Sequence, residues 1–231
     1  MKYKGIMFGD GRGTLGGAVY SRNRYGPYIR TWCKPVNPSS SRQQTVRGLF
    51  QALAEIWNGT LTDAERTAWN LFGNSVAIPD ALGGSIHLTG FSHFLRSNIP
   101  ILQVGGTRVD DGPTTFVLPE ADPTFAAAAT EDDQKLGVTF DALLGWANEE
   151  GGYLAVSMSQ PRAASRNYIG SPFRYAGVVE GDAVTPPTSP AELDVPFAVA
   201  ADQKIEVFAR ILRADGRVSN PFRHTSSVAA S

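Results

Sequence analysis

The sequence has little cysteine and histidine and no long apolar run, and these absences exclude several classes of protein. Its 231 residues include 1 cysteine and 3 histidines. A lone thiol, Cys33, cannot build an internal disulfide framework or a multi-thiolate metal site. No apolar run approaches the roughly 18 residues that a membrane span needs, and residues 1–10 lack the apolar region of a secretory signal. We therefore expect no membrane contact, no metal and no cofactor.

Charge is unevenly divided along the chain, although the whole sequence is close to neutral at −1. Residues 1–100 sum to +6 and residues 101–231 to −7. Glycine, serine, tyrosine and proline crowd the basic start of the chain. A basic segment of this composition buries little of its own surface and usually lies on another molecule. For residues 1–38 we expect an extended arm that is able to form a β-hairpin.

Basic and aromatic side chains are interleaved in this arm. The candidate interface residues are Arg22, Arg24, Tyr25, Tyr28, Arg30 and Trp32. Arg and Tyr are enriched at protein interfaces, and the same mixture suits phosphate contacts with base stacking. The sequence leaves both partners open: an acidic surface of a neighbouring protein, or nucleic acid. We prefer assembly, because the acidic second half of another copy is a ready partner.

Residues 39–104 have the period of α-helices. Ser41 with Gln44 predicts an N-terminal capping box for the first helix. Apolar residues then recur at i, i+3, i+4 and i+7, and Gly59 should end the helix.

Two shorter helices are expected after it. Thr62 with Glu65 predicts a second capping box, and Thr89 should cap a third helix that ends before Pro100, because the residue before a proline avoids the helical conformation. Residues 74–86 between these helices are expected to form a loop.

The remainder has the composition of a linker followed by a β-domain. Residues 105–134 are rich in glycine, proline and acids, and predict a linker with one strand at 115–118. Residues 135–231 alternate apolar and polar positions between turn signals, which is typical of an antiparallel sandwich. The expected strands are 136–140, 153–159, 174–179, 193–199, 205–212 and 218–226. The predicted fold class is therefore α+β: an extended arm, a small three-helix segment (39–104), a linker and a β-sandwich domain (135–231).

No motif in the chain predicts an enzyme. Residues 11–16 fit G-x-G-x-x-G, but neither a following helix nor an acid about 20 residues on is predicted, as a dinucleotide site requires. His87 and His93 are six residues apart, which does not place them on one helix face. Cys33 has basic neighbours but no catalytic partner in the sequence. We expect a protein without enzymatic activity.

One stretch of the β-domain resembles a known family. In residues 204–221 an alternating strand ends in Ala214-Asp215-Gly216 and continues as Val218-Ser219-Asn220-Pro221. This resembles the last hairpin of a fibronectin type III domain. The resemblance implies an immunoglobulin-like sandwich.

The first half also resembles uncharacterised phage and prophage-associated proteins. The residues that carry this resemblance are Gly16-Gly17, Tyr25-Gly26, Arg30, Gln44, Arg47, Phe50, Trp57, Leu61-Thr62, Glu65-Arg66, Trp69 and Thr89-Gly90-Phe91. It implies a virion protein made in the host cytoplasm, and it transfers no functional residue. The expected function is structural: a head decoration, neck or tail accessory protein that assembles with other virion proteins or with itself through its arm. Two alternatives remain, a nucleic-acid-binding module using the arm and a host-surface or carbohydrate adhesion module using sandwich loops such as 163–171.

Overall fold

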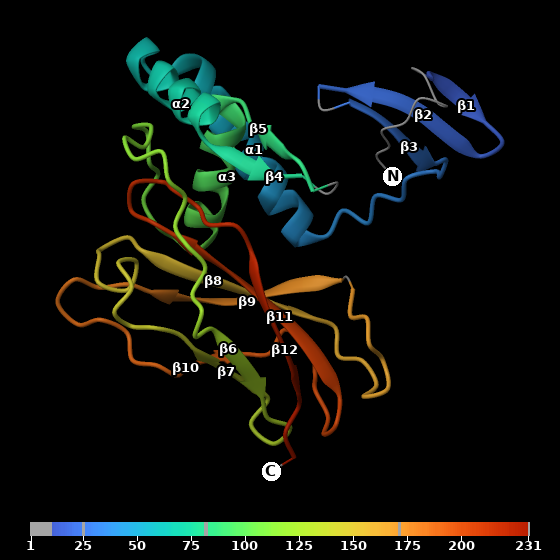
Figure 1. The fold of residues 1–231 in the computed structure, drawn as a ribbon, viewed down its shortest axis with the longest axis vertical. Helices are drawn as coiled ribbons and strands as arrows, with labels where there is room; N and C mark the ends of the chain where they lie inside the picture. Colours follow the sequence, from blue (N-terminus) through green and yellow to red (C-terminus); the bar gives the residue numbers. More distant parts are fainter. Residues whose placement is uncertain (1–10, 25, 81–82, 171, 231) are drawn as a thin grey trace.

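A computed structural model describes residues 11–24, 26–80, 83–170 and 172–230. The protein is α+β, with three helices and several antiparallel sheets. A three-stranded sheet comes first along the chain, a helical unit second, and two facing sheets last (Figure 1).

The predicted arm forms a small antiparallel sheet, which we call the arm sheet. Its strands are β1 (Gly13–Leu15), β2 (Ala18–Asn23) and β3 (Gly26–Thr31), in the order β1-β2-β3. Gly16 and Gly17 connect β1 to β2 with φ of 54° and 80°, the left-handed conformation that a two-residue hairpin turn requires. The expected hairpin is therefore present, with a third strand added to it. Residues 33–40 then run without regular structure to the first helix.

The helical unit contains three helices and one short hairpin. Its elements are α1 (Ser41–Gly59), α2 (Asp63–Ser75), β4 (Ala77–Pro79), β5 (Ser85–His87) and α3 (Gly90–Gln103). The prediction that 74–86 is only a loop is wrong, because β4 and β5 pair with each other across it. Aromatic side chains from all three helices form the core of the unit, including Trp57, Trp69, Phe72, Phe91 and Phe94.

The N-terminal caps of α1 and α2 can be compared with the capping boxes predicted from the sequence. At α2 the hydroxyl of Thr62 accepts from the backbone N–H of Glu65 at 3.3 Å, and the carboxylate of Glu65 accepts from the N–H of Thr62 at 2.6 Å, so this box is confirmed. At α1 the cap is Ser40, one residue before the predicted Ser41. Its hydroxyl accepts from Gln43, and because serines occupy 39, 40 and 41 the sequence alone does not distinguish them.

The end of α3 was predicted wrongly. Pro100 lies inside the helix, which continues to Gln103. Proline in the last turn removes only one donor, the N–H that would bond to the carbonyl of Arg96. Burial of the next residue, Ile101, against the β-domain stabilises that last turn.

Two antiparallel sheets form the rest of the chain. One has the order β10-β7-β6, from β6 (Ala126–Ala129), β7 (Lys135–Thr139) and β10 (Ala191–Asp194). The other has the order β12-β11-β8-β9, from β8 (Tyr153–Ser159), β9 (Phe173–Glu180), β11 (Lys204–Leu212) and β12 (Phe222–Ser227). Their facing sides share one apolar core.

The strand predictions for this region are largely confirmed, with four differences. β10 spans Ala191–Asp194, so it begins and ends earlier than the predicted strand at 193–199 and overlaps only its first two residues. β12 begins at Phe222 rather than at 218. β6 was not predicted and lies in the stretch assigned to the linker. The strand predicted at 115–118 is wrong, because that stretch has no regular structure.

The helical unit is joined to the second sheet through α3. The hydroxyl of Ser97 donates to the carbonyl of Gly216 at 2.5 Å, and the guanidinium of Arg96 donates to the carbonyl of Ser219 at 2.9 Å. Ile101, Leu212 and Val218 form a small apolar cluster beside these bonds. The turn between β11 and β12 therefore packs directly on a helix.

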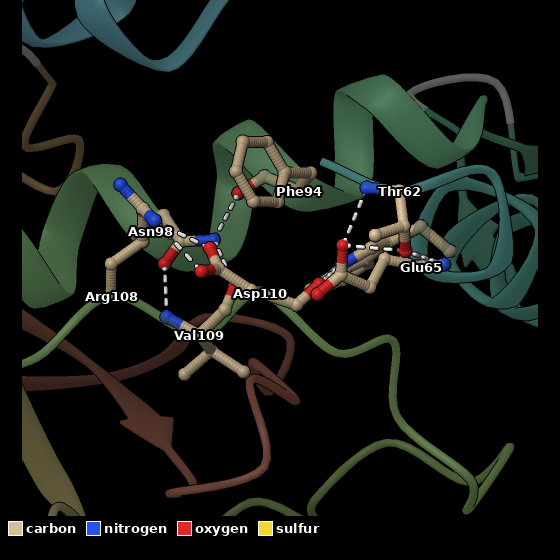
Figure 2. Close-up of polar contacts among 8 residues, drawn as sticks. Thr62, Glu65, Phe94, Asn98, Arg108, Val109 and Asp110 are labelled. Carbon is tan, nitrogen blue, oxygen red and sulfur yellow. Dashed lines mark hydrogen bonds and ion pairs between the residues drawn. The ribbon is translucent and has the colours of Figure 1, made fainter. Parts of the chain in front are cut away.

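The side chain of Asn98 fixes the segment that leaves α3 (Figure 2). Its amide nitrogen donates to the carbonyls of Phe94 and Val109 at 3.1 and 2.9 Å, and its oxygen accepts from the N–H of Val109 at 2.7 Å. Nearby, the indole N–H of Trp69 donates to the carbonyl of Asp110 at 2.7 Å. Residues near 109, assigned to a linker from composition, are thus hydrogen-bonded to two helices.

We predict that Asn98→Ala lowers the free energy of unfolding by about 2–4 kcal/mol, because it removes a buried side chain and leaves partly buried backbone groups of Val109 without partners. The measurement is urea unfolding followed by tryptophan fluorescence. Asn58→Ala is the matched control: Asn58 also donates to a helical carbonyl, that of Ala54, but is exposed, and its loss should cost less than about 0.5 kcal/mol. Equal losses in the two variants would contradict the role given to Asn98.

We also predict that stability falls between pH 6.5 and pH 4 through His93. This side chain is 1% exposed, and burial, with the nearby charge of Arg96, lowers its pKa from 6.5 to about 4. The folded protein therefore favours neutral His93. Its contribution is complete above pH 6.5 and is lost as the pH falls through 4, by up to about 3 kcal/mol.

The measurement is the unfolding free energy at a series of pH values. His93→Phe should flatten the slope between pH 4 and 6.5, whereas His87→Gln, at an exposed position on β5, should leave it unchanged. An identical slope in wild type and His93→Phe would show that other groups cause the acid sensitivity.

Candidate assembly interface

The arm sheet has no core of its own. None of the described residues between 11 and 40 is buried, and only Gly11 and positions 18–21 and 26–29 are half-buried. A three-stranded sheet is stable on its own only when it has a hydrophobic face or packs against a helix. The arm sheet is therefore a surface that a partner can complete.

Cross-strand pairing assigns the predicted interface residues to two different faces. Paired residues of neighbouring strands point to the same side of a sheet, and successive residues alternate between sides. Tyr28 and Arg30 are opposite Ser21 and Val19, so they share one face. The backbone N–H of Trp32 continues the ladder by donating to the carbonyl of Gly17 at 2.7 Å, which extends the same alternation. We call Tyr28, Arg30 and Trp32 the contact face.

The structure does not bring all six predicted residues together. Arg22 is opposite Pro27 and lies on the other face, with Tyr20 and Ile29. Arg24 is in the turn between β2 and β3. Tyr25 lies outside the described residues.

Two apolar residues that sequence reasoning missed are also exposed on the arm. Leu15 is 73% exposed and Val36 is 88% exposed, and Trp32 on the contact face is 61% exposed. In the sequence Leu15 is a single apolar residue next to the Gly16-Gly17 turn. The alternation of apolar and polar residues does not show whether such a residue is exposed or buried. Exposed apolar side chains beside cations are typical of a surface that binds protein.

Exposed charges of opposite sign lie on the arm and on the β-domain. Arg12, Arg24, Arg30 and Lys34 are exposed and form no ion pair with any described residue. On the β-domain and the segment before it, the exposed acids that likewise have no ion pair with a described residue are Asp111, Glu120, Asp132, Asp133, Glu150, Glu180, Glu192 and Asp202. The two sets are complementary between copies of the chain.

The structure also places the glycine-rich motif and Cys33, which the sequence analysis considered as candidate sites. Residues 13–15 of the glycine-rich motif form β1 and no helix begins there, so the geometry of a dinucleotide site is not formed. Cys33 is exposed in the irregular segment after β3. Across the described ranges, no three His, Cys, Asp or Glu side chains gather where they could hold a metal ion. None of the helices in the described part of the chain is both long and apolar enough to cross a membrane.

No family model, no curated protein and no solved structure matches the chain. Function must therefore be inferred from the geometry and charge of the molecule itself.

We predict that the chain associates through the contact face and that Arg30→Ala combined with Trp32→Ala weakens this association at least tenfold, because Arg and Trp residues at the centre of a contact carry a large share of the binding energy. Sedimentation velocity over a concentration series measures the effect. Thr31→Ala is the control, since Thr31 is exposed but points to the opposite face. Equal effects of the double variant and of Thr31→Ala would exclude this face as the contact.

Proposed function

We propose that this protein is a structural, non-enzymatic component of a bacteriophage virion, a head decoration, neck or tail accessory protein that assembles through its arm sheet. The observation that carries the proposal is a folded sheet in which no described residue is buried, and in which Arg24 and Arg30 are exposed without an ion pair to any described residue. The resemblance of the first half to phage-associated proteins supports the virion setting. The partners are other virion proteins or copies of this chain.

The proposed fold of residues 126–230 is an immunoglobulin-like sandwich of the fibronectin type III kind. Numbered from β6 in chain order, the two sheets have the strand orders 5-2-1 and 7-6-3-4. In an immunoglobulin-type sandwich the first, second and fifth strands share one sheet, and the third, sixth and seventh share the other. The β11–β12 hairpin contains the residues that carry the sequence resemblance. Such sandwiches host many functions, so the arm and not the sandwich supports the proposed role.

The proposed mechanism is arm-to-body docking between neighbours. The aromatic side chains of the contact face, Tyr28 and Trp32, are buried against an acceptor surface on a neighbouring molecule. Arg30 forms an ion pair with an acid on that surface. Contacts between exposed opposite charges are screened over about 8 Å at physiological ionic strength. The assembly should therefore be favoured at low salt and loosened, but not abolished, at high salt, because apolar burial remains.

Deletion of residues 1–38 tests this proposal. The shortened chain should remain folded, because none of the described residues from 11 to 38 is buried. It should elute as a monomer where the full chain forms a defined oligomer or polymer. Size-exclusion chromatography with light scattering measures the mass, and circular dichroism checks the fold. If the shortened chain assembles as the full chain does, the arm is not the interface.

A second candidate function is nucleic-acid binding by the same face, since Arg30 lies between two aromatic residues that could stack on bases. Its affinity should fall steeply with salt, by roughly one power of concentration per phosphate contact. The ratio of absorbance at 260 and 280 nm across the elution peak separates the two. A monomer that carries nucleic acid at low salt and loses it at high salt would replace assembly with this function.

A further inference from the structure

A pocket of about 420 Å³ lies where the helical unit meets the β-domain. Its walls come from α1 and α3 on one side and from the outward face of β8, β9 and β11 on the other. This volume is within the range of roughly 300–1,000 Å³ of ligand pockets in proteins. Most of the wall is apolar, from Phe50, Leu95, Ile99, Val104, Phe208 and Leu212.

Two arginines from opposite walls reach this pocket. Arg96 comes from α3 and Arg210 from β11, and both are partly buried. The guanidinium of Arg96 donates to one neutral group, the carbonyl of Ser219. The Nε of Arg210 is buried and has no hydrogen-bond partner. No carboxylate of the described chain forms an ion pair with either.

The two positive charges are close enough to influence each other. Burial and the charge of Arg210 lower the pKa of Arg96 to about 10, and burial lowers the pKa of Arg210. Arginine side chains stay charged in proteins at neutral pH, so both groups are cations. Holding two like charges in a partly desolvated site without a counter-ion is unfavourable, and a bound anion would remove that cost.

A third arginine stands at the mouth of the pocket. Arg42, in the first turn of α1, lies over the ring of Tyr175 with 5.6 Å between the guanidinium carbon and the ring centroid. Phe50, also from α1, is 48% exposed at the same opening. The entrance is therefore both cationic and aromatic.

We propose that this pocket, the two-arginine pocket, binds a carboxylate carried on an apolar body. The planar guanidinium fork of arginine matches the two oxygens of a carboxylate, and Arg96 and Arg210 supply that part of the site. The apolar walls receive the remainder of the ligand. Inorganic phosphate has no apolar part, so it would leave these apolar walls uncovered. The inference does not depend on the arm or on the proposed virion role.

The same chemistry can come from two sources. One is a free amphiphilic carboxylate, and the other is a Glu or Asp beside apolar residues on a neighbouring polypeptide. Residues 115–121 of this chain are an example of the second kind, since Phe116, Val117 and Glu120 are exposed. A peptide of that sequence serves as the probe for it.

The experiment is isothermal titration calorimetry of the full chain with 4-phenylbutyrate and, separately, with the capped 115–121 peptide. Controls are neutral 4-phenylbutyramide and inorganic phosphate. We expect saturable binding of at least one carboxylate probe, and at least tenfold weaker binding of the amide and of phosphate. The tighter of the two carboxylate probes identifies the source.

Variants connect the binding to the two arginines. Arg210→Met should weaken binding at least tenfold and keep the fold, because the Nε that it removes has no partner. Arg96→Met should have the same effect on binding, with its fold checked by thermal unfolding because it also loses the bond to Ser219. Arg174→Met, on β9 outside the pocket, should leave the affinity unchanged. Absence of binding by both carboxylate probes, equal binding of the amide or of phosphate, or unchanged affinity in Arg210→Met would overturn the proposal.

Discussion

Three consecutive side chains of α3 hold the two halves of this molecule together. Arg96 and Ser97 donate to carbonyls in the turn between β11 and β12, and the amide of Asn98 both donates to and accepts from the backbone of Val109, in the segment that leads to the β-domain. Consecutive helical residues point about 100° apart, so one helical turn can fix neighbours on two sides. Because these polar groups are buried or partly buried, each unmade bond would cost free energy, which specifies a single placement of the helices on the sheet.

In that placement the two faces of the second sheet pack against different parts of the molecule, one against the first sheet and the other against the helical unit. Alternate residues of β8 and β11 face the first sheet, and Tyr153, Ala155 and Leu212 on their other side pack near α3. A strand with one buried face was expected from the alternation, and at this end of the sheet both faces are covered. The arrangement also brings Arg210 of β11 opposite Arg96 of α3, so the pocket is a product of the junction and of neither half alone.

The parts that the sequence predicted well are those set by neighbouring residues. The Thr62–Glu65 box and the alternation of Tyr153–Ser159 need only local side chains, and both are confirmed. β6 is a run of four alanines, which have low strand propensity, and it is a strand because of its pairing with β7. The bond from Ser97 to Gly216 joins residues 119 positions apart, and no local pattern contains it. For the arm, interleaving in the sequence indicated one mixed surface, whereas strand pairing separates Arg22 from Arg30.

The irregular segment between the arm sheet and α1 limits the distances over which the arm can act. Its eight residues, 33–40, are all exposed and span at most about 30 Å when fully extended. In an assembly built through the arm, this segment would set the maximum distance between a body and the acceptor surface on its neighbour. That distance is the length of the extended segment plus the length of the arm sheet. Once other contacts of a particle hold two neighbouring bodies together, a short tether also keeps the arm at an effective concentration in the millimolar range near its acceptor, so a weak individual contact can persist. Spacing between subunits, more than the strength of any one contact, would then decide which neighbours are joined.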